Sequence, residues 1–131
     1  MSSDKPPEFF FDRSLGKTSA RLLREAGWTI HLIADFYPED ASNVAEEEWI
    51  REGCSRGWAL LTKDKKIRYR ADELGALQAG HLLCLAADNL GLREMVDRFV
   101  DAGPAIGRAI RDHEVGFWHV QAAGRITRMW P

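Results

Sequence analysis

Three acidic residues, Asp12, Glu46 and Asp64, occur where a short apolar segment gives way to a loop or to the start of a helix. If the apolar segments are parallel strands of one sheet, the three carboxylates emerge at the same carboxyl-terminal edge, where open α/β folds place their active sites. Carboxylates gathered in this way repel one another unless a cation neutralises them. Mg²⁺ or Mn²⁺ would do so and leave positions for phosphate oxygens and an activated water, which suits phosphodiester hydrolysis.

Each of these acids also has a purely structural explanation. Asp12 can begin a turn, Glu46 can favour the positive end of a helix dipole, and Asp64 can lie in a lysine-rich turn. We place Glu46 in the site because it comes earliest in its helix, nearest to the expected sheet edge. Glu47 follows it directly and spacing hardly separates the two, so Glu47 stays an additional candidate.

The elements that must position these acids follow from the apolar pattern. Short runs rich in aromatic and β-branched residues alternate with stretches of helical periodicity, which predicts βαβ units and a parallel sheet. The predicted strands span residues 8–12, 28–33, 58–62 and 82–86. Predicted helices span 14–26, 45–56, 72–79 and 90–102, the last with an alternative end beyond Pro104 at Arg111. Residues 115–121 and 125–130 predict a terminal β-hairpin.

Length and composition indicate one domain. The chain has 131 residues, 45% of them hydrophobic and 29% charged, which is close to globular averages. We expect residues 1–7 to be disordered and 115–131 to form the hairpin of a single domain covering 1–131. The net charge of -2 excludes a uniformly basic nucleic-acid-binding surface but not local basic clusters.

Cysteines, histidines and hydropathy exclude several other classes. Cys54 and Cys84 lack the spacing of a zinc site or a disulfide framework, and we expect buried reduced thiols. The four histidines show no mutual metal spacing, so we interpret each as structural or exposed. The polar N-terminal residues are not followed by the apolar segment of a signal peptide. The longest apolar run, 82–87, is far too short to span a membrane. We therefore expect a cytoplasmic protein.

Three segments of the chain carry a family resemblance. They are Phe-Phe-Phe-Asp-Arg-Ser-Leu-Gly at 9–16, Ala-Glu-Glu-Glu-Trp-Ile at 45–50 and Gly-Trp-Ala-Leu-Leu-Thr-Lys-Asp-Lys-Lys-Ile at 57–67. Through them the chain resembles PIN-like domains, especially the compact VapC-type toxins, with Thr-x-Asp as the most specific part. The resemblance implies a three-layer α/β/α sandwich around a central, mostly parallel sheet. It also implies Mg²⁺- or Mn²⁺-dependent endoribonuclease activity and a cognate antitoxin.

The resemblance assigns roles to the same acids that were singled out above. Asp12 matches the first-strand acid, Glu46 the acid at the start of the helix before the Thr-x-Asp strand, and Asp64 the acid of Thr-x-Asp itself. The helix acid is usually Asp in the family, and a further mid-chain Glu of longer PIN domains has no clear counterpart here. Glu73 is a candidate fourth acid or, equally, a solvated residue of a helix face.

Further residues near these acids could bind the substrate. A basic cluster adjoins the site and would steer RNA across the acidic edge, or would simply form a solvated surface. It consists of Lys63, Lys65, Lys66, Arg68 and Arg70. Arg13, next to Asp12, is a further candidate for a phosphate contact, or is a simple ion-pair partner. The hydroxyl of Thr62 could orient a metal-bound water, or Thr62 could be an ordinary strand residue.

The sequence also suggests a surface for partners and leaves alternative functions open. The tryptophans are most simply core and interface residues. Trp118 and Trp130 in the hairpin could instead present an apolar patch to a second subunit or to an antitoxin segment. The main alternative to a toxin ribonuclease is a catalytically inactive PIN-like binding or regulatory module, motivated by Glu in place of the usual Asp at position 46. A phosphoacceptor receiver domain is a weaker alternative, because it needs adjacent acids on the first strand, where only Asp12 is present.

Overall fold

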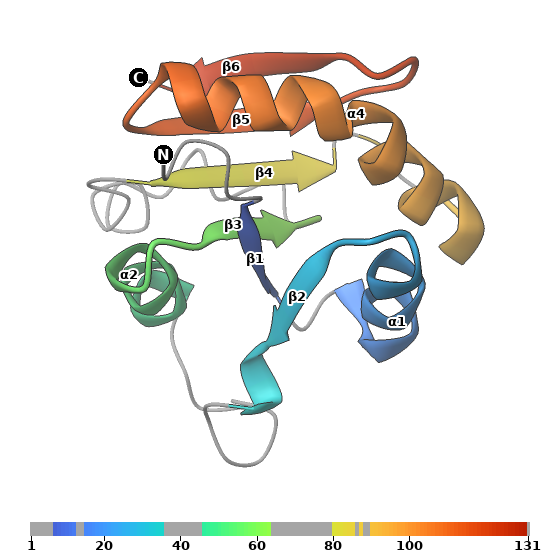
Figure 1. Ribbon diagram of the computed structural model, residues 1–131, viewed down its shortest axis with the longest axis horizontal. Helices are drawn as coiled ribbons and strands as arrows, with labels where there is room; N and C mark the ends of the chain where they lie inside the picture. Colours follow the sequence, from blue (N-terminus) through green and yellow to red (C-terminus); the bar gives the residue numbers. More distant parts are fainter. Residues whose placement is uncertain are drawn as a thin grey trace.

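The computed structural model describes residues 7–12, 15–35, 46–63, 80–85, 87 and 90–130, without the side chains of Ala34, Glu46 and Glu47. Within these residues one six-stranded sheet has the order β2-β1-β3-β4-β5-β6 (Figure 1). The strands are β1 (Glu8–Phe11), β2 (Thr29–Leu32), β3 (Ala59–Thr62), β4 (His81–Leu85), β5 (Gly116–Val120) and β6 (Ile126–Trp130). Neighbouring strands from β2 to β5 pair in parallel, and only β6 is antiparallel to its neighbour.

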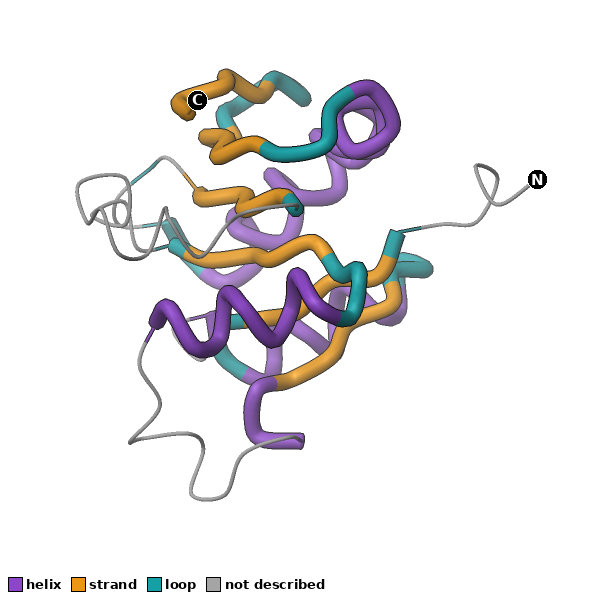
Figure 2. Tube along the Cα trace, turned by 90° about the vertical axis from the view of Figure 1, so that its left-hand side faces the viewer, coloured by secondary structure: helices purple, strands orange, loops and turns teal. Residues whose placement is uncertain are grey.

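Helices cover both faces of this sheet. The described helices are α1 (Lys17–Glu25), α2 (Glu46–Ser55) and α4 (Leu92–Asp112), with a 3-10 helix at Ile33–Asp35 after β2. Buried residues of α1 and α4 pack in one hydrophobic cluster and those of α2 in another, and Figure 2 shows helices on both sides of the strands. This confirms the predicted α/β/α sandwich with a mostly parallel sheet and a C-terminal hairpin.

The alternation of side chains along the strands explains the two clusters. Phe9 and Phe11 of β1 face α1 and α4, whereas Phe10 between them packs with Trp49 and Ile50 of α2. The same alternation recurs in β3 and β4, whose described residues are all buried. A sheet covered on both faces needs apolar residues at every strand position, which is why these segments are continuous apolar runs in the sequence.

Helix boundaries differ from the prediction at one end of α1. We expected this helix to follow an N-cap at Ser14, but it begins at Lys17, and Gly16 takes the N-cap position with φ +83°. That backbone conformation favours glycine, so the chain completes its turn after β1 before the helix starts. The long C-terminal helix runs without interruption through Pro104, as the longer alternative predicted. Its inner face, including Phe99 and Ile106, stays buried on the sheet and offsets the missing N–H.

Several expectations fall outside the described residues or need correction. The predicted helix 72–79 and the disorder predicted for residues 1–6 lie outside them. Cys84 is buried, but Cys54 is only half-buried, so the expectation of two buried thiols was half right; both cysteines are unbridged. No helix in the described part of the chain has the length and apolar character needed to cross a membrane.

The hairpin forms as predicted, but one of its tryptophans is not on the surface. Trp118 is only 7% exposed and packs in the α1/α4 cluster, and its indole N–H donates a hydrogen bond to Nδ1 of His81 at 3.1 Å. This confirms the prediction that Trp118 is a core residue, and the alternative of a surface patch is wrong for it. Trp130, on the edge strand β6, is half-buried against the α2 cluster.

Candidate active site

Asp12 lies directly beyond the end of β1, in contact with the end of β3. Its backbone N–H donates to the carbonyl of Leu61 at 3.0 Å, which extends the pairing of the two strands by one residue. Its carboxylate Oδ2 accepts a hydrogen bond from the hydroxyl of Thr62 at 2.8 Å. Asp12 is 5% exposed and Thr62 is fully buried, so the pair is held rigidly at the margin of the core.

The strand order makes this position a natural site. The chain leaves β1 toward β2 on one side and leaves β3 toward β4 on the other, while β1 and β3 are themselves neighbours. In open α/β sheets, such a reversal of strand order opens a crevice outside the carboxyl ends of the two strands, where ligands bind. Asp12 follows β1 and Thr62 ends β3, the two neighbouring strands at which the strand order reverses.

Both side chains point to the face of the sheet that α2 covers. Phe10 and Leu60 belong to the α2 cluster, and Asp12 and Thr62 follow each of them by two residues along their strands. Because side chains two residues apart lie on the same face of an extended chain, the carboxylate and the hydroxyl share the face of α2. The hydrogen bond between them agrees with this placement.

The packing of α2 brings its first turn toward the same edge. Trp49 and Ile50 are buried, and the rings of Phe10 and Trp49 are 6.0 Å apart. Gly53 lies so close to the sheet that a Cβ there would be 2.7 Å from Leu60 Cδ2. From Gly53 the helix runs back to its first residue, Glu46, about 10 Å farther along the helix axis. The backbone of Glu46 is thus at the carboxyl-terminal end of the sheet, as predicted.

The structure describes only part of the predicted site. Lys63 follows Thr62 at the end of β3 and is exposed at this edge. The side chains of Glu46 and Glu47 lie outside the described residues, as do Arg13, Asp64, Lys65, Lys66, Arg68, Arg70 and Glu73. Among the side chains that are described, no group of three or more His, Cys, Asp or Glu residues could hold a metal. The three-carboxylate site therefore stays a prediction, with Asp12 as its one described carboxylate.

The carboxylate of Asp12, the described part of the predicted site, is suited to binding a hard cation. A carboxylate removed from water is costly unless opposite charge or hydrogen bonds compensate it. At Asp12 the hydroxyl of Thr62 supplies one such hydrogen bond and fixes the orientation of the carboxylate. Carboxylate oxygens are the ligands that Mg²⁺ and Mn²⁺ prefer, so this residue fits such an ion.

Sequence reasoning did not find this role of Thr62. It offered a water-orienting hydroxyl or an ordinary strand residue, whereas the hydroxyl hydrogen-bonds to the carboxylate of Asp12, 50 residues away in the chain. Only the parallel pairing of β1 with β3, which aligns Phe11 with Leu61, brings the two together.

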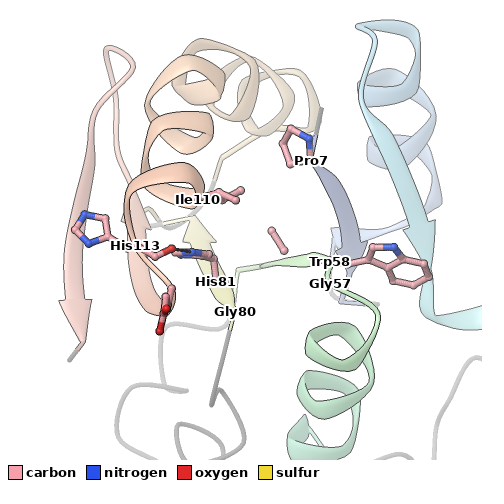
Figure 3. A pocket seen from close by; sticks show the side chains of 9 residues that line it. Pro7, Gly57, Trp58, Gly80, His81, Ile110 and His113 are labelled. Atoms are coloured by element: carbon pink, nitrogen blue, oxygen red, sulfur yellow. Dashed lines mark hydrogen bonds between the residues drawn. The ribbon is translucent and has the colours of Figure 1, made fainter. Parts of the chain in front are cut away.

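A cavity of about 510 Å³ lies at the opposite end of the sheet (Figure 3). It is bounded by the residues that begin β1, β3 and β4 and by the C-terminal end of α4. Pro7 and Ile110 project into it, whereas the ring of Trp58 extends away and stacks on His31 of β2. The cavity is therefore separate from the acidic edge.

His81 at this cavity is a structural residue. Its Nε2 hydrogen-bonds to the carbonyl of His113 at 2.9 Å, and its Nδ1 accepts the indole N–H of Trp118, an arrangement that fits the neutral ring. Burial lowers the pKa of His81; the hydrogen bond to the carbonyl of His113 partly opposes this shift, and the charges of His113 and Arg128 add to it. These contacts agree with the structural role predicted for the histidines.

A comparison with known protein families shows which family this chain belongs to. Residues 7–88, more than half of the chain, match the model of a family described as PIN like domain. The chain belongs to the PIN-like domain family. The matched span of this PIN-like domain includes Asp12, Glu46 and Asp64, and leaves α4 and the terminal hairpin outside it. No match was found among curated proteins or among solved structures.

Proposed function

We propose that this PIN-like domain is a metal-dependent endoribonuclease that hydrolyses RNA phosphodiester bonds as the toxin of a toxin-antitoxin pair. The observation that carries the proposal is the buried Asp12 carboxylate, hydrogen-bonded to Thr62 where the strand order of a PIN-like sheet reverses. PIN-like domains are commonly nucleases, and the helix that begins with Glu46 starts at the same edge. We expect the protein to act in the cytoplasm, because the proposed RNA substrate and antitoxin would be found there.

In the proposed reaction Asp12, Glu46 and Asp64 hold Mg²⁺ or Mn²⁺. The ion would lower the pKa of a bound water and stabilise charge on the leaving oxygen. Thr62 holds the Asp12 carboxylate in one orientation, which is how residues behind a metal ligand tune its site. Lys63, exposed at the same edge, supplies positive charge for the RNA backbone.

The decisive experiment replaces Asp12 by Asn and measures cleavage of single-stranded RNA with Mn²⁺. Asn keeps a carbonyl oxygen that can accept the hydrogen bond of Thr62 but removes the charge that binds the ion. We expect activity below about 1% of wild type, a loss of at least about 2.7 kcal/mol in transition-state stabilisation. The thermal midpoint should stay equal or rise, because a buried charge has been removed.

Asp97→Asn is the matched control, since Asp97 is an exposed residue of α4 that pairs with Arg93. It should cleave RNA at the wild-type rate. Full activity of the Asp12 variant, or wild-type cleavage that persists in EDTA, would contradict the proposal. If Mn²⁺ does not bind at millimolar concentration and RNA stays intact, the catalytically inactive binding module becomes the better interpretation.

The toxin role and the partners need their own test. Induced expression of the wild type should arrest growth, and expression of Asp12→Asn should not. Equal growth with both proteins would remove the toxin role while leaving nuclease activity open to the assay above. Because Trp118 is buried, an antitoxin segment or a second copy that docks on the hairpin would have to use the outer edge of β6. Light scattering of the purified protein distinguishes a monomer from a dimer.

A further inference from the structure

The first turn of α1 has the features of an anion site beside the candidate active site. The carbonyl of Asp12 accepts a hydrogen bond from the N–H of Leu15 at 3.1 Å, so the turn after β1 leads from Asp12 straight to the start of α1. A helix N-terminus presents N–H groups without helical acceptors and the positive end of the helix dipole. Here this end lies at the sheet edge where strand order reverses, the usual place for phosphate in open α/β sheets.

The described residues of this N-terminus provide neither an acidic side chain nor a side-chain cap. The first turn contains no acidic residue, and no described side chain caps it. Lys17 is the first residue of the helix and is exposed. The first helical hydrogen bond to Gly16 comes from Ala20, and the N–H groups of Thr18 and Ser19 have no acceptor among the described residues.

A second, independent observation points to a ligand. Ser19 is only 2% exposed, yet its hydroxyl has no hydrogen-bond partner in the described part of the chain. A buried hydroxyl without a partner costs about 1–3 kcal/mol, so such groups are rare unless something pairs with them. The Cα–Cβ bonds of a helix tilt toward its N-terminus, and residues three apart share a face, so the Cβ of Ser19 lies on the same side of the first turn as Gly16.

There is also room for the ligand at this end of the helix. Among the described residues no atom lies within 4 Å of a Cβ built on Gly16, and the φ of +83° there disfavours any residue that has a side chain. An oxyanion can therefore approach the backbone at Gly16 closely. Ala20 and Leu23 anchor the helix in the core, so its first turn cannot move away.

We propose that Gly16, Lys17, Thr18 and Ser19 form a phosphate-binding subsite, in which backbone N–H groups and the Ser19 hydroxyl bind an oxyanion of the substrate. Asp12 lies on the α2 face of the sheet and α1 covers the other face, so the subsite holds a phosphate next to the one that is cleaved. The assignment of this phosphate to RNA rests on the proposed nuclease function. The subsite supplies attraction at an edge where the carboxylates repel the RNA backbone.

The first test uses inorganic phosphate and the metal-free protein. Titration with phosphate at constant ionic strength should shift the amide NMR signals of Thr18 and Ser19 in a saturable way. Ser19→Ala should weaken binding at least threefold, and its thermal midpoint should stay equal or rise, because a buried hydroxyl without a partner is removed. Ser55→Ala is the matched control, since it removes a hydroxyl from the far end of α2 that bonds to the carbonyl of Glu52. It should bind phosphate as the wild type does.

The second test uses RNA and separates this subsite from the reaction. Ser19→Ala should raise KM for RNA about threefold to tenfold and leave kcat within twofold, whereas Asp12→Asn should abolish kcat. Absence of amide shifts at residues 16–19, or equal phosphate affinity of the wild type and Ser19→Ala, overturns the subsite even if RNA is cleaved. Phosphate binding at these residues by a protein that does not cleave RNA supports the subsite and removes only its link to the nuclease.

Discussion

The hydrogen bond between Thr62 and Asp12 provides a quantitative test of how the site is built. Thr62→Val replaces the hydroxyl by a methyl group of similar size and leaves the buried carboxylate without this donor. A hydrogen bond to a charged group contributes about 1.5–3 kcal/mol, so we expect the free energy of unfolding to fall by about that amount at neutral pH without metal. For a chain of this length this corresponds to a drop of roughly 4 °C in thermal midpoint per kcal/mol.

The same substitution in the Asp12→Asn background should cost less. Asn is neutral, and a hydrogen bond between neutral groups contributes about 0.5–1.5 kcal/mol. The double-mutant cycle should therefore show a coupling energy of about 1 kcal/mol or more between the two positions. Urea unfolding of the four proteins measures it. Thr62→Ser is the control, because it keeps the hydroxyl and loses one methyl group, at a cost of about 1 kcal/mol in both backgrounds.

Catalysis should respond in the same direction. Loss of a residue that orients a metal ligand costs about 10–100-fold in metal affinity or activity, and we expect this range for Thr62→Val with Mn²⁺. Thr62→Ser should keep activity within a few-fold of wild type. Equal destabilisation by Thr62→Val in both backgrounds, or wild-type activity of this variant, would refute the view that Thr62 positions a charged Asp12.

Two further predictions concern the framework of the fold. Because burial lowers the pKa of His81, the folded protein binds fewer protons than the unfolded chain, so stability should fall as pH drops below about 6.5, by at most about 1.4 kcal/mol per pH unit. Urea unfolding at pH 7.5 and 5.5 should show a larger loss for the wild type than for His81→Gln, and equal losses would contradict this. Gly53→Ala should cost about 1–3 kcal/mol, because the added Cβ meets Leu60 at 2.7 Å and pushes α2 from the sheet. If that variant unfolds in urea with the stability of the wild type, α2 does not pack on the sheet as closely as the contact between Gly53 and Leu60 indicates.

Much of the architecture could be predicted because its signals are local. Apolar runs of strand length, helical spacing and glycines at the ends of helices are visible within ten or so residues, and they located the described strands to within one or two positions. The same local patterns placed Asp12 at a strand end and Glu46 at a helix start. Errors arose where a local signal competed with tertiary context. Ser14 is a good N-cap by composition, but the turn after β1 delays the helix to Lys17.

The sequence by itself thus determined the α/β class, the positions of the described strands and the place of Asp12 at the end of β1, because periodicity and turn chemistry depend on neighbouring residues. Which strands are adjacent was decided only in the tertiary structure, since pairing joins segments far apart in the chain. That decision put Thr62 against Asp12 and enclosed Trp118 with His81, and the packing of α1 on the sheet buried the Ser19 hydroxyl. Contacts of this kind depend on strand order and side-chain packing, which no local pattern encodes.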